Sequence, residues 1–390
     1  QSLSHTSAAL RFALIDEIIF PIKRGYRLLG TAEVVSEPES ATEDNSDTVD
    51  MPSLEVSYRF QHDRIQQAAY SLTDVAYRAD IHLRVGRRLH KLLGDDAGDA
   101  VFDVVRHLNL GAARITDPAE RLTLVALNQS AAHKAKAKTA YAMAAQLLAS
   151  GLSLLDEAQR SSDKGLWFNL LLEQADCLQR SGQYEKAEGL LLQLDVLATT
   201  PLLQGRISTV RIELLQAMGQ FPRSVAAGLL ALSSLGTVLP DSDSELERAL
   251  QLELEAITAQ LAVRPLSELA NLPELVEPVR LVELDLLIRL DTPTFAVNRT
   301  LSALITAKQV SLSLRHGNAR GSVVGYMALA MLLSRMRGQY SEALRLGELA
   351  LLINTRYHCL DFEARLRYLF GSFLPFVRPL REAIIEQQRA

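Results

Sequence analysis

The chain has 390 residues, of which 48% are hydrophobic and 22% charged, and its formal net charge is −5. It contains 71 Leu and 48 Ala but only 20 Gly and 13 Pro. Leu and Ala form helices readily whereas Gly and Pro interrupt them, so the composition favours a mainly α fold. It excludes collagen-like, disulfide-rich and wholly disordered proteins, and a β-sandwich would need more turn residues. The scarcity of chemically active groups leads us to expect scaffolding or regulation rather than catalysis.

The negative charge is concentrated in one segment near the N-terminus. No Lys or Arg occurs between Arg27 and Arg59, and residues 31–55 contain eight acidic side chains, without which the chain would be slightly cationic. The segment is also rich in Ser and Pro, which predicts an acidic loop over 31–55. We favour a tolerated surface insertion over a partner-binding or phosphorylated loop.

Residues 1–95 mix helical and extended patterns. The elements predicted in chain order are a helix over 8–22, strands over 26–29 and 56–60, and helices over 62–72 and 81–93. This order is typical of a small winged-helix-like α+β module with an expanded wing. A generic α+β subdomain is the alternative.

From about residue 100 onward the chain reads as consecutive helices with a repeated motif. Three Gly-Gln-aromatic triplets begin at Gly182, Gly219 and Gly338, and similar positions recur at intervals of about 40 residues. The repeat-defining residues, all with a structural role, are Tyr141, Ala144, Ala175, Gly182, Tyr184, Ala187, Gly219, Phe221, Gly338, Tyr340 and Ala343.

Each residue type in the motif has a physical reason. Gly permits the turn between two antiparallel helices, the aromatic ring packs across the hairpin, and Ala lets the helices approach closely. One hairpin cannot bury both of its faces, so neighbouring hairpins must stack. We therefore predict a TPR-like α-solenoid over 96–235 and 301–390, with degenerate repeats over 236–300.

The intervening residues 236–300 depart from the repeat. Ser242 and the acidic residues after it predict an N-cap for the next helix. Four prolines are expected to divide this region into short helices: Pro265, Pro273, Pro278 and Pro293.

A search for catalytic, cofactor-binding and metal-ligating motifs returns nothing. The sequence contains no phosphate loop, no G-x-G-x-x-G, no nucleophile elbow, no C-x-x-C and no H-E-x-x-H. We therefore assign no catalytic, cofactor or metal residue. His62-Asp63-Arg64 is reminiscent of a phosphoacceptor histidine, but no Pro follows it. We favour the interpretation that His62 and Asp63 begin and cap a helix.

Cysteine usage and hydropathy bear on location. Cys177 and Cys359 lie in apolar stretches and give no disulfide framework, which fits a reducing cytoplasm. No apolar run is long enough to span a bilayer, so we expect no membrane partner.

Two basic clusters raise the question of nucleic acid binding. The first comprises Arg84, Arg87, Arg88, His90 and Lys91, and the second Lys134, Lys136 and Lys138. A basic helix of a winged-helix module can contact DNA. Because the chain as a whole is acidic and aromatic residues do not interleave with the clusters, we favour a solvated face or an interdomain contact.

Several segments resemble one signalling family. Residues 58–72 contain Phe60, His62, Asp63, Arg64, Gln67 and Tyr70 in an order that is similar to the family's F-x-H-D-R-[VI]-Q-Q-A-A-Y-S-L segment. Further likenesses occur at 82–87, 106–118, 134–141 and 313–318. The family comprises AAA-type (STAND-like) ATPase modules of multidomain kinases, many with a Ser/Thr-kinase-like domain first and GAF, histidine kinase and receiver domains last.

The resemblance implies that this chain is an internal fragment, with the ATP- and Mg-binding core upstream. The fragment itself would be a non-catalytic arm, while the parent protein would be a histidine or Ser/Thr kinase. The implied partners are proteins or other domains of the same chain, with an unknown small ligand as a further option and nucleic acid disfavoured. A transcriptional regulator of the STAND class, with winged-helix contact to DNA or a partner, is the alternative.

Overall fold

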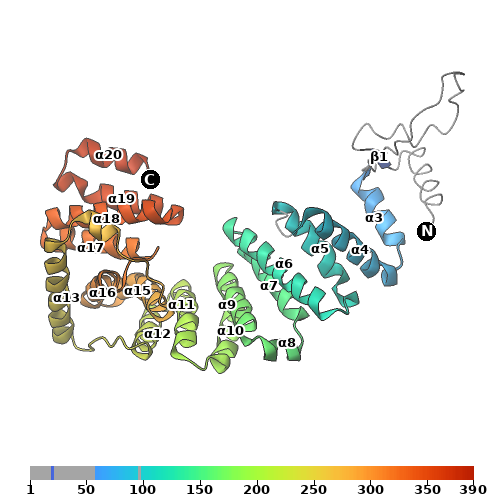
Figure 1. Ribbon diagram of the computed structural model, residues 1–390, viewed down its shortest axis with the longest axis horizontal. Helices are drawn as coiled ribbons and strands as arrows, with labels where there is room; N and C mark the ends of the chain where they lie inside the picture. Colours follow the sequence, from blue (N-terminus) through green and yellow to red (C-terminus); the bar gives the residue numbers. More distant parts are fainter. Residues whose placement is uncertain (1–18, 22–57, 95–97) are drawn as a thin grey trace, which may run out of the picture. The chain divides into compact units, whose positions relative to one another are not determined.

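The computed structural model describes residues 19–21, 58–94 and 98–390, and they are mainly helical, as the composition predicts (Figure 1). Contacts divide the chain into two units. The first comprises residues 1–92 and 106–115, and the second comprises 93–105 and 116–390.

The first unit combines a short ladder with helices. β1 (Ile19–Pro21) pairs antiparallel with β2 (Tyr58–Phe60), with Ile19 opposite Phe60. The helices of this unit are α3 (Asp63–Leu72), α4 (Val75–Leu93) and the second half of α5 (Val101–Gly111), with the 3₁₀ turn η3 (Ala112–Arg114).

Two of the predictions for residues 1–95 are confirmed and two are corrected. The strand predicted over 56–60 is present at Tyr58–Phe60 and the helix predicted over 62–72 at Asp63–Leu72, whereas the helix over 81–93 begins earlier, at Val75. The helix over 8–22 is wrong at its C-terminal end, because Ile19–Pro21 form a strand. β-branched and aromatic residues favour strands, and a short apolar run does not separate the two states. The rest of that helix, the strand over 26–29 and the acidic loop over 31–55 lie outside the described residues.

The sheet of the described residues consists of three paired positions on two strands. Such a ladder does not support the winged-helix α+β module expected from the sequence. For the described part of the first unit, the structure supports a helical subdomain with one short ladder.

The second unit is built of helices that pack in chain order (Figure 1). Its helices are η2 (Gly98–Ala100), α6 (Pro118–Ala137), α7 (Tyr141–Leu154), α8 (Glu157–Ser162), α9 (Lys164–Arg180), α10 (Tyr184–Leu197), α11 (Pro201–Ala217), α12 (Phe221–Ser234), α13 (Asp243–Val263), α14 (Leu266–Ala270), α15 (Pro278–Val297), α16 (Arg299–His316), α17 (Ser322–Arg337), α18 (Tyr340–Tyr357), α19 (Leu360–Phe373), η4 (Leu374–Phe376) and α20 (Leu380–Gln388). The packed pairs are α6 with α7, α9 with α10, α11 with α12, α15 with α16, α17 with α18 and α19 with α20.

Four of these pairs share one turn geometry. The residue two positions before the second helix has a positive φ, and these residues are Thr139 (58°), Gly182 (78°), Gly219 (73°) and Gly338 (62°). No atom lies within 4 Å of a Cβ built on the three glycines, so Gly is favoured there by backbone conformation alone. Thr139, which is β-branched, occupies the same conformation at a steric cost.

We expect Thr139→Gly to raise the free energy of unfolding by about 0.5–1 kcal/mol, because it removes a Cβ from a left-handed backbone. The Thr139 side chain is exposed, so the substitution changes the buried surface area very little. Gly182→Ala is the matched change in the opposite direction and should lower the unfolding free energy by about 1 kcal/mol. Urea unfolding followed by circular dichroism measures both. A destabilised Thr139→Gly variant would contradict the steric explanation.

The region between residues 236 and 300 differs from the expected series of short helices. α13 spans 21 residues and α15 spans 20 with Pro293 inside it. The predicted N-cap is confirmed, since the Ser242 hydroxyl accepts the amide of Glu245. α12 packs directly on α15, and the intervening α13 and α14 pack instead on α16 and α18. The segment 236–277, here called the excursion, therefore leaves the hairpin series and packs on later helices.

This excursion makes α16 the central helix of the C-terminal core. Of its 18 residues, 13 are buried, and it packs against α13, α15 and α17. A helix surrounded in this way has no polar face, which is why its sequence shows no amphipathic stripe.

Asn318 ties the excursion to the core. Its backbone amide donates to the carbonyl of Pro273 (2.9 Å), and its carbonyl accepts from the amide of Leu275 (2.9 Å). Its fully buried side chain donates to the carbonyl of Leu269 (2.8 Å) and accepts from the hydroxyl of Tyr326 (3.1 Å). One asparagine therefore satisfies buried polar groups of three segments.

Candidate functional sites

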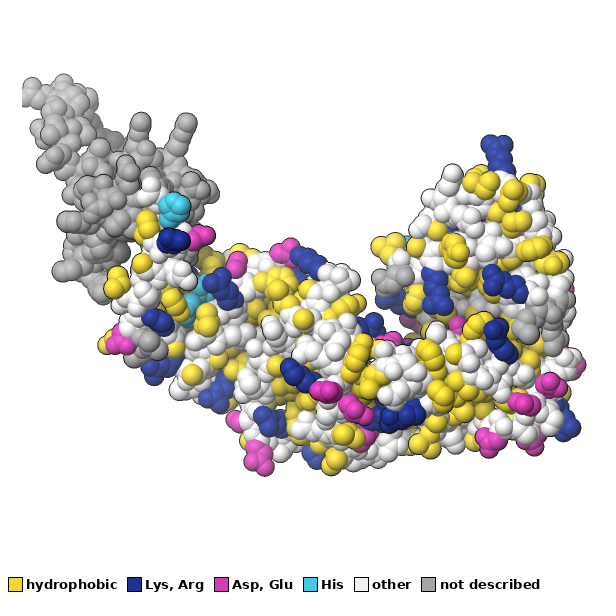
Figure 2. All heavy atoms as spheres, turned by 180° about the vertical axis from the view of Figure 1, so that it is seen from behind, with side chains coloured by type: hydrophobic (Ala, Val, Ile, Leu, Met, Phe, Trp, Pro, Cys, Tyr) yellow, Lys and Arg dark blue, Asp and Glu magenta, His cyan; other side chains and the backbone are white. Residues whose placement is uncertain are grey.

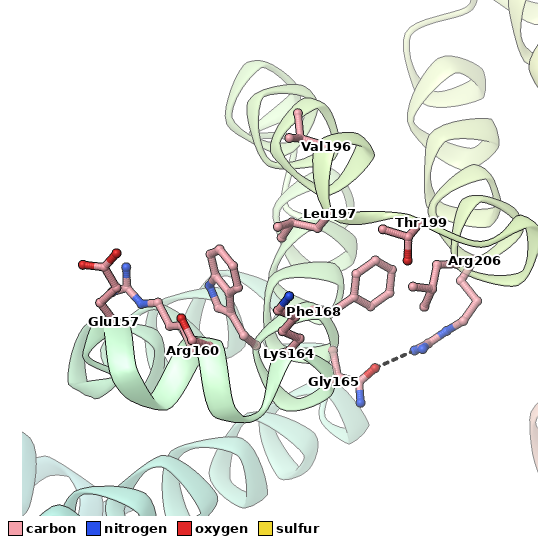
Figure 3. Close-up of a pocket in the computed structure, with 13 residues that line it drawn as sticks. Glu157, Arg160, Lys164, Gly165, Phe168, Val196, Leu197, Thr199 and Arg206 are labelled. Atoms are coloured by element: carbon pink, nitrogen blue, oxygen red, sulfur yellow. Dashed lines mark hydrogen bonds between the residues drawn. The ribbon is translucent and has the colours of Figure 1, made fainter.

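A pocket of about 650 Å³ lies where α8, α9, α10 and α11 meet in the second unit (Figure 3). Its apolar lining comes from Trp167, Phe168, Val196, Leu197 and Leu203. The size falls within the range of small-molecule sites. Asp163 caps the N-terminus of α9, because its side chain accepts a hydrogen bond from the backbone amide of Leu166 (2.8 Å).

Three cationic side chains line the same pocket. The guanidinium of Arg160 lies 5.9 Å from the ring centroid of Trp167, and that of Arg206 lies 5.3 Å from Phe168. An Arg206 nitrogen also donates to the side-chain oxygen of Asn169 (3.0 Å), as the dashed line in Figure 3 shows. The third cation is Lys164. Rings and an amide, rather than acids, thus position the two guanidinium groups.

A ladder of polar contacts, here called the charge ladder, joins α6, α9, α11 and α15. It begins where His133 contacts Glu173 (2.8 Å) and Lys136 contacts Asp176 (3.1 Å). Its remaining pairs are Arg180 with Asp176 (2.7 Å), Arg180 with Glu213 (2.7 Å), Arg289 with Glu213, and Arg289 with Asp285 (3.1 Å). The ladder therefore links the first helices of four successive hairpins.

The ladder favours the charged forms around Asp176, whereas at its other end burial raises the pKa of Asp285 to about 6 and lowers the pKa of Arg289. Burial opposes ionisation of Asp176, but Arg180 and Lys136 outweigh it and hold the pKa of this carboxyl below its ordinary value. Burial likewise disfavours the charged Lys136, yet Asp176 raises the pKa of that ammonium group. Half-buried charges that share partners in this way resist separation more than isolated surface pairs do.

Three side chains from the resemblance segments meet in the first unit. The hydroxyl of Tyr70 on α3 lies 3.0 Å from Nε2 of His82 on α4. Nδ1 of His82 lies 2.9 Å from Nδ1 of His107 on α5. Because each imidazole contributes one nitrogen to that bond, one ring must donate and the other accept. The contacts tie α3, α4 and α5 together, and Arg78 covers the Tyr70 ring at 4.7 Å.

The structure places the other family-motif residues around the start of α3. Phe60 ends β2, and His62 occupies the N-cap position without a side-chain capping bond. Asp63 is the first helical residue, where its charge favours the helix dipole. Arg64 and Gln67 are exposed on the same helix.

The repeat-defining residues occupy equivalent places. Tyr141, Tyr184, Phe221 and Tyr340 are the first residues of α7, α10, α12 and α18. The small residues three positions later, together with Ala175 on α9, are fully buried: Ala144, Ala187, Ser224 and Ala343.

The rings at these turns also reach the next hairpin. Arg180 on α9 lies over the Tyr141 ring at 5.8 Å, and Tyr340 stacks on Phe376 with centroids 5.2 Å apart. Sequence reasoning omitted Ser224, although its register after Phe221 identifies it. It also omitted Trp167 and the three pocket cations, which belong to no motif.

The two basic clusters have different surroundings. All three lysines of the second cluster make contacts within the chain: Lys134 to the carbonyl of Gly98 (2.7 Å), Lys136 to Asp176, and Lys138 to Asp99 (2.7 Å). The first cluster lies on α4. On the face of the molecule in Figure 2, cationic and acidic side chains are interspersed rather than gathered by sign.

Both cysteines are free and buried. Burial raises the pKa of the Cys177 thiol on α9 to about 11, so this thiol is protonated at neutral pH. Cys359 precedes α19 rather than lying within a helix.

Residues 19–21, 58–94 and 98–390 contain no group of three His, Cys, Asp or Glu side chains arranged to hold a metal ion. Among the helices of the described chain, none combines the length and apolar character needed to cross a membrane.

Comparison with known proteins yields a partial relative. The chain is 30% identical over 161 residues to the hybrid signal transduction histidine kinase G of Dictyostelium discoideum. The match covers 35% of this chain and 5% of that protein. No protein-family model matches the chain. The similarity supports a signalling-kinase context. The kinase activity is that of the Dictyostelium protein, of which the match covers 5%.

Proposed function

We propose that this chain is a non-catalytic regulatory and protein-interaction arm of a multidomain, ATP-binding signalling protein of the histidine kinase type. In this role it couples the binding of a ligand or partner to kinase output. The observation that carries the proposal is the sequence match to a hybrid histidine kinase over a segment of this mainly helical chain.

The arm is proposed to be a TPR-like α-solenoid. The repeated turn geometry and the buried small residue at each equivalent contact support this assignment. The AAA or STAND ATPase module with ATP and Mg upstream and the cytoplasmic location rest on the sequence resemblance and composition. The proposed partners are other proteins or domains of the same chain.

The charge ladder gives the proposed coupling a physical route. Arg180 contacts acids on both α9 and α11, and Glu213 contacts cations on both α9 and α15. A displacement of one hairpin therefore changes the environment of charges on the next. Contiguous networks of this kind can carry free energy between distant sites.

Two measurements test the proposal. The purified chain, incubated with labelled ATP and Mg²⁺, should show neither turnover nor autophosphorylation, and measurable turnover would disprove the non-catalytic role. In a protein that carries this chain beside a kinase, deletion of residues 116–390 should change the autophosphorylation rate by about fivefold or more. An unchanged rate, with ATP binding intact, would remove the regulatory role.

The alternative, a STAND-class transcriptional regulator, has less support. The lysines of the second basic cluster are occupied within the chain. Binding to duplex DNA that weakens steeply with salt would favour this alternative over the proposed arm.

A further inference from the structure

We propose that the pocket between α8, α9, α10 and α11 binds a phosphate monoester carried on a flat aromatic ring. The proposal deepens the proposed function by naming the chemistry of its ligand. It rests on that function for the role of the ligand and on the geometry of this pocket for the ligand's chemistry.

The lining of the pocket is rich in cationic side chains. Arg160, Lys164 and Arg206 all line the pocket, and in the described part of the chain no carboxylate lies within ion-pair distance of any of them. Glu157 is the acidic side chain among the lining residues. By contrast, Arg180 and Arg211 lie on the same helices α9 and α11 but outside the pocket lining, and both pair with acids. The pocket therefore carries a positive charge that the protein does not neutralise.

One donor of the lining has no acceptor. The Nε atom of Arg160 is shielded from solvent and has no hydrogen-bond partner. A buried guanidinium nitrogen without an acceptor is costly, which favours a small shift of Arg160 that brings its guanidinium against an anion. In Figure 3, Arg160 and Arg206 lie on opposite sides of the pocket, with Lys164 and Phe168 between them. An anion that enters there faces cations from more than one helix.

Contacts within the protein hold the two guanidinium groups near the pocket before a ligand binds. The contact with Trp167 positions Arg160, while Phe168 and Asn169 together position Arg206. Side chains that are already ordered lose less entropy on binding. The pocket is therefore built before the ligand arrives.

The remaining lining selects for the rest of the ligand. Trp167 offers aromatic surface, and Leu197 and Leu203 add aliphatic surface. A flat ring can stack on these side chains while its phosphate meets the cations. A phosphate monoester carries close to two negative charges at neutral pH, which suits three cations better than a single carboxylate does. A volume of about 650 Å³ accommodates a ring and a phosphate together.

The chain provides its own reporter for a test. Trp167 is the single tryptophan among 390 residues, so its fluorescence reports on this pocket. Adenosine monophosphate serves as the probe, because adenine does not absorb where tryptophan alone is excited. We expect a saturable change in Trp167 emission with half-saturation below about 1 mM. Adenosine and inorganic phosphate, each offering one half of the ligand, should bind at least about tenfold more weakly.

Variants distinguish binding in the pocket from nonspecific attraction to positive charge. Arg206→Gln and Lys164→Gln should each weaken binding of adenosine monophosphate at least about tenfold, whereas Lys186→Gln on the exposed face of α10 should not. Far-ultraviolet circular dichroism checks that each variant stays folded.

Several results would overturn the proposal. These are the absence of saturable binding, equal binding of adenosine or of inorganic phosphate, an equal loss in Lys186→Gln, or tighter binding of an acidic peptide. None of them bears on the kinase measurements above, so failure of this proposal is distinguishable from failure of the proposed function.

Discussion

Asn318→Ala is expected to lower the free energy of unfolding of the C-terminal core by about 2–5 kcal/mol. The truncation leaves the carbonyl of Leu269 and the hydroxyl of Tyr326 without their side-chain partner. Tyr326 is fully buried, and burial raises the pKa of its hydroxyl, which therefore stays protonated and needs an acceptor. Urea unfolding followed by circular dichroism measures the loss, and hydrogen exchange over 265–277 should rise with it.

Two further variants locate the cause of this loss. His316→Ala, at an exposed position two residues earlier, should change stability by less than about 0.5 kcal/mol. Tyr326→Phe removes the orphaned hydroxyl, so adding it to Asn318→Ala should cost less than the sum of the two single changes. An Asn318→Ala variant as stable as the parent, or strict additivity, would show that the buried network contributes nothing.

Gly317, which precedes Asn318, constrains the same junction through its backbone conformation. Gly317 has a φ of 106°, and a Cβ built there would lie 2.2 Å from the carbonyl oxygen of Pro273. Both the conformation and the contact exclude a side chain. The sequence marks 313–318 only as one of several resemblance segments, and the structure supplies the reason for its Gly-Asn pair.

Ala187→Leu is expected to lower the free energy of unfolding by about 3 kcal/mol, because Ala187 is fully buried between α9 and α10. Three added carbons there must displace the helices or force strained rotamers. Glu188→Leu, at the adjacent exposed position, is the control and should change stability by less than about 0.5 kcal/mol. Urea unfolding and the emission of Trp167, in the same core region, are the measurements.

A graded substitution refines this second prediction. The equivalent residue of the next hairpin is Ser224, whose hydroxyl donates to the carbonyl of Ile212 (3.1 Å). The corresponding carbonyl for position 187 is that of Ala175. Ala187→Ser should therefore cost less than about 1 kcal/mol, because the hydroxyl finds the same acceptor. A cost for Ser equal to that for Leu would rule out close helix approach as the reason for the small residue.

Local sequence accounts for much of the helical hairpin geometry. The positive φ angles at Gly182, Gly219 and Gly338 follow from residue type, and the aromatic residues after them begin helices as the repeat predicts. Thr139 shows the limit of this reasoning, since the tertiary contacts of its hairpin impose the same turn on a residue that disfavours it.

The candidate sites were not predictable to the same degree. The pocket combines 157–169 with 196–206, and no spacing in the sequence relates Arg160 to Arg206. The ion pairs of the charge ladder form only where neighbouring hairpins stack at a suitable offset. The sequence does not give that offset. Tyr70, His82 and His107 stand out as parts of resemblance segments, yet their hydrogen bonds require α3, α4 and α5 to pack together.

The sequence by itself determined that this protein is mainly helical, because Leu and Ala are abundant and the turn residues recur at intervals compatible with hairpins. Only the tertiary structure decided that α13 and α14 leave the hairpin series, so that α13 covers α16 and α14 packs on α18. The physical reason is that secondary structure follows from local conformational preferences, whereas burial follows from which surfaces meet. α16 has no amphipathic face from which its place could be read, and its 13 buried residues are explained by packing against α13 in addition to its chain neighbours α15 and α17.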